Sequence, residues 1–86
     1  MISGKIVVVG EVGLHARPAA EFVREAERFK SEVRISRDGM SVNGKSILAL
    51  LTLAAETGSE LVLEVEGEDE TVAFPVLKAK LEASID

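Results

Sequence analysis

The sequence contains no cysteine, which excludes both a disulfide framework and a thiolate metal site. Tryptophan and tyrosine are also absent, and the chain has only three phenylalanines. It therefore lacks the series of stacking aromatics that single-stranded nucleic-acid binders use, and its core must be aliphatic. The formal net charge of −5 argues against the basic surface that binds a phosphate backbone. We expect no nucleic-acid partner.

Long apolar runs are missing as well. No stretch reaches the length of a membrane-spanning helix, and Met1 to Lys5 lack a signal-peptide pattern. We therefore expect a cytoplasmic protein without direct membrane insertion. Hydrophobic residues nevertheless make up 47% of the chain, a share typical of a folded protein. With 86 residues and no internal repeat or linker, the sequence predicts a single domain over residues 1–86.

The hydrophobic pattern predicts four strands and three helices in the order βαββαβα. Strands are expected over Lys5–Val9, Glu32–Arg37, Met40–Val42 and Glu60–Glu66, with a tight hairpin turn at Asp38-Gly39. Helices are expected from behind His15 to about Phe29, from Ile47 to about Ala55, and over the C-terminal stretch. Strands with one solvated face favour an antiparallel sheet that helices cover on its other side.

Each predicted helix has one stripe of apolar residues that we expect to be buried. The stripes are Ala19, Phe22, Val23, Ala26 and Phe29 in the first helix, Leu50, Leu53 and Ala54 in the second, and Ala73 or Phe74, Leu77, Leu81 and Ile85 in the third. Gly58 is a candidate cap for the second helix. Pro75 leaves two alternatives for the third: a start near Phe74, or a kink in an earlier turn.

The only histidine of the chain, His15, lies in the segment Gly13-Leu14-His15-Ala16-Arg17-Pro18-Ala19. It stands between a predicted strand and turn and a predicted helix start. The first N–H groups of a helix have no intrahelical partner and carry a partial positive charge, which suits an anion. A neutral imidazole beside such donors and beside Arg17 is suited to accept a phosphoryl group. The alternative is that His15 only caps the helix or packs against it.

This segment resembles the phosphorylation-site motif of HPr, the histidine-containing phosphocarrier family of the bacterial phosphoenolpyruvate-dependent sugar phosphotransferase system. A second match, Asn43-Gly44-Lys45-Ser46-Ile47-Leu48, extends the resemblance over essentially the whole chain. The resemblance implies an α+β open-faced β-sandwich with three helices on one face of a four-stranded antiparallel sheet. It also implies the strand order 1-4-2-3 and a third helix that starts around Glu70.

The resemblance further implies that His15 accepts a phosphoryl group from phosphorylated enzyme I and passes it to a sugar-specific enzyme IIA. The protein would then be a phosphoryl-group carrier and not an enzyme. The backbone N–H groups of Ala16 and Arg17 would hold the phosphate, and the Arg17 guanidinium would pair with phosphate oxygens or partner carboxylates. We expect no metal and no cofactor, because one histidine without a neighbouring carboxylate cluster supplies too few ligands.

Two surface stretches are candidate docking sites for partners. They are Ala16, Ala20, Arg24 and Glu27 on one flank of the first helix, and Ile47, Leu48 and Leu51 on the second. A short helix lying on a sheet buries only one stripe, so the second set is expected to stay partly exposed. The alternatives are an ordinary helix surface for the first set, and burial under a loop or a homodimer contact for the second. We expect a monomer.

Ser46 precedes the second helix, at a position where serine is a preferred N-cap. In HPr of many Gram-positive bacteria the matching serine is phosphorylated by a dedicated kinase, HPr kinase/phosphorylase, so Ser46 is also a candidate regulatory site. Two competing hypotheses are an HPr-like paralogue of a nitrogen-regulatory phosphotransferase chain and a regulatory binding module of the same fold. Ser46 with Gly44-Lys45 favours the sugar branch, and His15 with Arg17 argues against the binding module.

Overall fold

The computed structural model describes residues 1–7, 16–53 and 60–83, and of residues 16–18 and 83 it describes only the main chain. Within these ranges the elements follow the predicted order βαββαβα. The strands are β1 (Ile2–Val7), β2 (Glu32–Arg37), β3 (Met40–Asn43) and β4 (Glu60–Glu66). The helices are α1 (Ala16–Ala26), α2 (Ile47–Leu53) and α3 (Glu70–Ala83).

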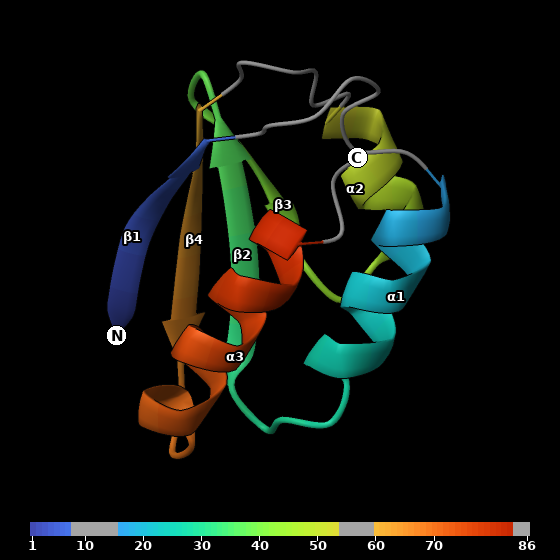
Figure 1. The fold of residues 1–86 in the computed structure, drawn as a ribbon. Coiled ribbons are helices and arrows are strands. Elements are labelled where there is room, and N and C mark those ends of the chain that lie inside the picture. Colours follow the sequence, from blue (N-terminus) through green and yellow to red (C-terminus); the bar gives the residue numbers. More distant parts are fainter. Residues whose placement is uncertain (8–15, 54–59, 84–86) are drawn as a thin grey trace.

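The four strands form one antiparallel sheet in the order β1-β4-β2-β3, which is the order that the resemblance implied. Figure 1 shows all three helices on the same face of this sheet. The α3 helix packs on β1 and β4, α2 packs on β2 and β3, and α1 contacts both other helices. The predicted open-faced α+β sandwich is confirmed.

The core is aliphatic apart from Phe22, as the composition predicts. Alternate residues of β4 point inward, and the predicted stripes of the three helices meet them. The buried apolar residues are Ile6, Ala19, Phe22, Val23, Ala26, Val33, Ile35, Leu50, Leu53, Leu61, Leu63, Val65, Ala73, Leu77 and Leu81. Phe29 and Phe74 are only partly buried at its edge. Ala54, Gly58 and Ile85 lie outside the described residues.

The predicted turn between β2 and β3 is confirmed. Asp38 and Gly39 both have positive φ, 50° and 85°, as a two-residue type I′ turn requires. Asp and Gly are the residues that reach this region at low cost, because aspartate tolerates the left-handed conformation and glycine has no Cβ.

The predicted bounds of the first strand and of the first helix were wrong. The first strand already starts at Ile2, because its backbone pairs with β4 from Ile2 opposite Val65 to Val7 opposite Glu60; Val8 and Val9 lie outside the described residues. The first helix ends at Ala26 and not at Phe29. There the N–H of Phe29 donates to the carbonyl of Ala26 at 3.1 Å, a contact three residues back that tightens and terminates a helix.

The third helix begins at Glu70, where the resemblance placed it, and continues through Pro75. A start near Phe74 was therefore wrong. Proline has no N–H to donate to the carbonyl of Thr71, a loss inside a helix that costs about 3 kcal/mol. The side chains before the helix, described below, fix its start. None of the helices in the described ranges has the length and apolar character needed to cross a bilayer.

Candidate functional site

The first turn of α1 is the part of the proposed phosphoryl site that the structure describes. His15 itself lies outside the described residues, and α1 begins at the next residue, Ala16. The main chain of Ala16 and Arg17 is helical, while their side chains are not described. No acidic residue occupies this first turn, although the whole chain carries a net charge of −5. The positive end of the helix dipole is therefore not neutralised from within its own first turn.

The flank of α1 that was predicted to contact partners lies at the surface where it is described. Ala20 is half-buried, while Arg24 and Glu27 are exposed. None of these three residues belongs to the buried core. The core residues of this helix are Ala19, Phe22, Val23 and Ala26. Contact of Ala20, Arg24 and Glu27 with a partner stays a prediction, as does that of Ala16.

Ser46 is the N-cap of α2, as its position in the sequence predicts. Its hydroxyl accepts the N–H of Ala49 at 3.2 Å, and its carbonyl accepts the N–H of Leu50 at 3.1 Å. The first bond satisfies one of the N–H groups that a helix start leaves without an intrahelical partner.

The aliphatic residues on the outer side of α2 are exposed, as predicted. Leu48 is 77% exposed, Ile47 40% and Leu51 36%. Burial under the preceding loop is therefore excluded for this set, which we call the α2 patch. The α2 helix contacts α1 and lies beside its N-terminal half (Figure 1). The fold thus brings an exposed apolar cluster close to the first turn of α1.

The segment between β3 and α2 is held by contacts that the sequence did not reveal. A Cβ on Gly44 would come within 2.5 Å of the Val33 side chain, so only glycine fits there. The Asn43 Oδ1 accepts the N–H of Lys45 at 2.9 Å. The Lys45 ammonium reaches across to donate to the carbonyl of Phe29 at 2.8 Å, three residues beyond the C-terminal end of α1. A positive charge there is favourable for the helix dipole.

A second group of side chains fixes the start of α3. The Asp69 carboxylate accepts the N–H of Lys30 at 2.8 Å, the N–H of Ser31 at 2.9 Å, and the Ser31 hydroxyl. The Ser31 hydroxyl is the largest cause of a lowered pKa at Asp69, followed by the N–H of Lys30. Sequence reasoning did not identify these contacts, because the partners lie 38 and 39 residues away.

Glu70 reinforces the same start. Its carboxylate accepts the N–H of Gly67 at 3.1 Å and pairs with the amino group of Met1 at 3.1 Å. The pKa of Glu70 is lowered, first by the Gly67 N–H and then by the Met1 amino group. Together with Asp69, these bonds begin the helix ahead of Pro75.

On the open face of the sheet, the Arg34 side chain lies among three carboxylates. The Arg34 guanidinium contacts Glu32 at 3.1 Å, Glu66 at 3.2 Å and Glu64 at 3.5 Å. Its pKa is raised, with the hydrogen bond to Glu66 as the largest cause. Among the described residues no group of three or more histidine, aspartate or glutamate side chains is placed to hold a metal ion. Because His15 is not among them, the absence of a metal stays a prediction.

Comparison with known proteins decides the family. A family model described as the PTS HPr component phosphorylation site matches residues 2–83. This chain belongs to the HPr family. Proteins of the HPr family are phosphocarriers, and solved HPr structures share the fold described above.

The chain is similar both to proteins named HPr and to proteins named Crh. The phosphocarrier protein HPr of Borreliella burgdorferi is 40% identical over 96% of each chain. The HPr structure from Bacillus anthracis is 42% identical, covers 92% of this chain and 94% of its own, and has a TM-score of 0.86. The HPr-like protein Crh of Bacillus subtilis is 46% identical over 99% of this chain and 100% of its own. A crystal structure of Crh, with a TM-score of 0.79, is described as a dimer with a swapped domain.

Proposed function

We propose that this protein carries a phosphoryl group on His15, accepting it from phosphorylated enzyme I and passing it to a sugar-specific enzyme IIA. The observation that carries the proposal is the position of His15 directly before α1. The first turn of that helix offers N–H groups without intrahelical partners and contains no carboxylate that would repel a phosphate. Arg17 belongs to the same turn and supplies a guanidinium for phosphate oxygens or partner carboxylates.

In the proposed reaction a neutral ring nitrogen of His15, Nδ1 by resemblance to the family, attacks the phosphorus held by enzyme I. The N–P bond forms as the bond between phosphorus and enzyme I breaks. The second transfer repeats this with a nucleophile of enzyme IIA, and the imidazole returns to its neutral state. Each contact of the phosphate with the helix dipole stabilises it by about 0.3–1 kcal/mol. Such contacts hold the group without trapping it, so neither a metal nor a cofactor enters the proposal.

Both partners must reach the same end of α1, and the α2 patch lies beside it (Figure 1). We propose that enzyme I and enzyme IIA dock on the α2 patch and on the flank of α1. That flank consists of Ala16, Ala20, Arg24 and Glu27. Apolar surface at the centre with charged residues around it is the usual composition of a protein interface.

Labelling by phosphoenolpyruvate in the presence of enzyme I tests the carrier hypothesis. We expect the wild-type protein to gain one acid-labile phosphate and the His15→Ala variant to gain none. Circular dichroism and the thermal midpoint of both proteins establish that the variant is folded. A wild-type protein that takes no label from a competent enzyme I would contradict the proposal, and so would full labelling of His15→Ala.

We also propose Ser46 as a regulatory phosphorylation site, with an HPr kinase/phosphorylase as the partner. A phosphoserine would add roughly −1.5 to −2 charges beside Ile47 and Leu48. Because Ser46 is the N-cap, this charge would suit the α2 dipole and leave the fold intact. It would oppose docking on the α2 patch.

Ser46→Asp is therefore expected to slow phosphoryl transfer from enzyme I to His15. Ser46→Asn is the control, because asparagine also caps a helix but is neutral. Equal rates for all three proteins would count against this part of the proposal.

A second candidate function is that of a regulatory HPr-like module without phosphoryl transfer. The similarity to Crh favours it, whereas His15 and Arg17 favour the carrier. The labelling experiment separates the two. The expected monomer is tested by sedimentation equilibrium, because Crh and one HPr have been described as dimers.

A further inference from the structure

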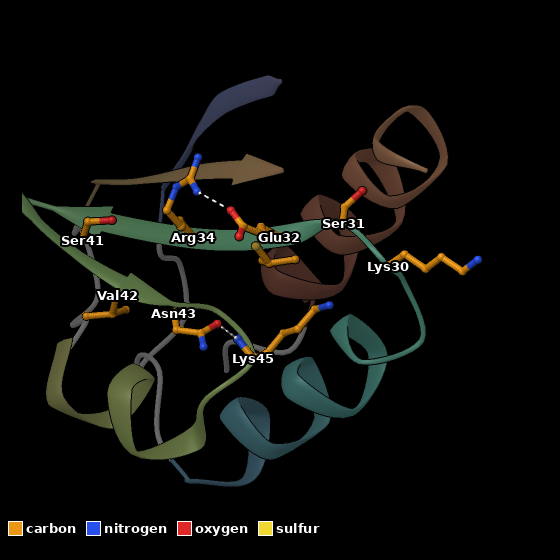
Figure 2. Close-up of a pocket in the computed structure, with 9 residues that line it drawn as sticks. Lys30, Ser31, Glu32, Arg34, Ser41, Val42, Asn43 and Lys45 are labelled. Atoms are coloured by element: carbon orange, nitrogen blue, oxygen red, sulfur yellow. Dashed lines mark hydrogen bonds and ion pairs between the residues drawn. The ribbon is translucent and has the colours of Figure 1, made fainter. Parts of the chain in front are cut away.

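A cavity of about 400 Å³ lies where β3 ends and the chain turns toward α2. Figure 2 shows it between the start of β2 and the Asn43–Lys45 turn. Its lining residues are Lys30, Ser31, Glu32, Val33, Arg34, Ser41, Val42, Asn43 and Lys45. The volume falls within the range of small-molecule sites. Nothing in the proposed carrier function uses this cavity.

At the cavity the Asn43 amide and the Lys45 ammonium are held in position. Each keeps donor hydrogens that no described residue accepts. The Oδ1 of Asn43 accepts the N–H of Lys45, which orients the amide. Its NH₂ group then has no acceptor among the described residues. The Lys45 ammonium has three donors and gives one to the carbonyl of Phe29. Both side chains are therefore fixed by a main-chain contact of their own while donors remain available.

The lining cation that remains available to an anion is Lys45, because glutamates already neutralise the other two. Three cations and one carboxylate, Glu32, line it, whereas the whole chain carries −5. Two of these cations are already paired: Lys30 extends away from the cavity to Glu68 at 3.2 Å, and Arg34 contacts three glutamates (Figure 2). The Lys45 ammonium has no carboxylate partner among the described residues.

We propose that this cavity binds a small phosphate monoester, with the Lys45 ammonium and the Asn43 amide donating to the phosphate oxygens. The Ser41 hydroxyl, which has no partner within the described part of the chain, is a third donor. The half-buried Val42 offers apolar surface to the carbon part of the ligand. Lys45 contacts the carbonyl of Phe29, just beyond the C-terminal end of α1. The 11-residue helix places that end about 16 Å from the first turn, so this site is separate from the first turn of α1.

The proposal is tested by titrating the ¹⁵N-labelled protein with inorganic phosphate and with glycerol 3-phosphate, against sodium chloride of equal ionic strength. We expect saturable shifts of the Asn43 side-chain amide and of the backbone amides of Glu32, Val33 and Lys45. Sodium chloride should not reproduce them. Shifts that follow ionic strength alone would overturn the proposal. Shifts confined to the first turn of α1 would overturn it too, while supporting the carrier site.

Three variants sharpen the test. Asn43→Asp keeps an oxygen for the Lys45 N–H but replaces the free NH₂ by a carboxylate. It should raise the dissociation constant for phosphate at least about tenfold. Lys5→Gln changes the net charge by the same amount on β1, the opposite edge of the sheet, and should leave the constant unchanged. Glu32→Gln removes the only carboxylate of the lining and should tighten binding severalfold. Equal constants for Asn43→Asp and the wild type would refute the site.

Discussion

The α2 and α3 helices cover the same face of the sheet, and each leaves aliphatic side chains in solvent. On α2 these are Ile47, Leu48 and Leu51, and on α3 they are Val72, 59% exposed, and Val76, 39% exposed. The surroundings differ. The α2 helix lies beside the start of α1, whereas the N-terminal half of α3 lies at the opposite end of the molecule (Figure 1). Exposed apolar surface therefore does not identify a docking site by itself. What distinguishes the two helices is the distance of their exposed residues from the proposed phosphoryl site.

The two helices also differ in how their starts are held. The Ser46 side chain caps α2 within its own helix. The start of α3 is bound to distant parts of the chain, through Asp69 to Lys30 and Ser31, and through Glu70 to Met1. Local capping suffices for the short helix. The α3 helix, which contains Pro75, has long-range partners as well.

The largest expected effect is on stability, and it should be similar for both helices. Leu50→Ala in α2 and Leu77→Ala in α3 are each expected to lower the free energy of unfolding by about 2–5 kcal/mol, because both side chains are fully buried. The control Leu48→Ala, at an exposed position, should change it by less than about 0.5 kcal/mol. Urea unfolding followed by circular dichroism measures all three. A large loss for Leu48→Ala would show that the α2 patch belongs to the core.

A smaller effect separates the exposed residues of the two helices. Leu48→Ala is expected to slow phosphoryl transfer from enzyme I roughly fivefold or more, the cost of truncating an interface residue worth about 1 kcal/mol. Val72→Ala removes a similar exposed side chain from α3 and should not change the rate. Rapid-quench measurement of labelled protein distinguishes them. If both variants transfer at the wild-type rate, the α2 patch does not dock enzyme I.

The smallest expected effect concerns the pH dependence of stability. The pKa of Asp69 is lowered from its ordinary value of 3.8, so its contribution is present above that value and is lost as the pH falls through the folded-state pKa. Asp69→Asn cannot offer acceptors to all three donors. It should be less stable than the wild type at neutral pH and approach it in acid. Glu68→Gln, an exposed neighbour, should follow the wild-type pH profile. Parallel profiles for Asp69→Asn and the wild type would contradict this account.

Much of the fold could be predicted because it depends on local patterns. The alternation of Leu61, Leu63 and Val65 marks one face of a strand. Asp38-Gly39 specifies a type I′ turn, and the period of about four in α1 marks its buried stripe. Ser46 as a cap also follows from position alone. The candidate site stays a prediction: the sequence places a histidine directly before a helix start, and His15 lies outside the described residues.

Apart from the end of α1, which a local contact sets, the errors and omissions involve contacts between distant residues. The extent of β1 depends on its register with β4. The start of α3 depends on Asp69, which overrides the signal of Pro75 by bonding to residues 38 and 39 positions earlier. The cavity beside Asn43 depends on Lys45 reaching Phe29, 16 positions away. No local pattern encodes these partners.

The sequence by itself determined the local elements and led to the proposed chemistry, because a lone histidine, a helix start and the spacing of apolar residues are properties of neighbouring residues. Only the tertiary structure decided how the start of α3 is held, that the α2 patch lies beside the start of α1, and which donors at Asn43 and Lys45 remain without an acceptor among the described residues. The physical reason is that a hydrogen bond between distant residues exists only once the core has brought them within about 3 Å.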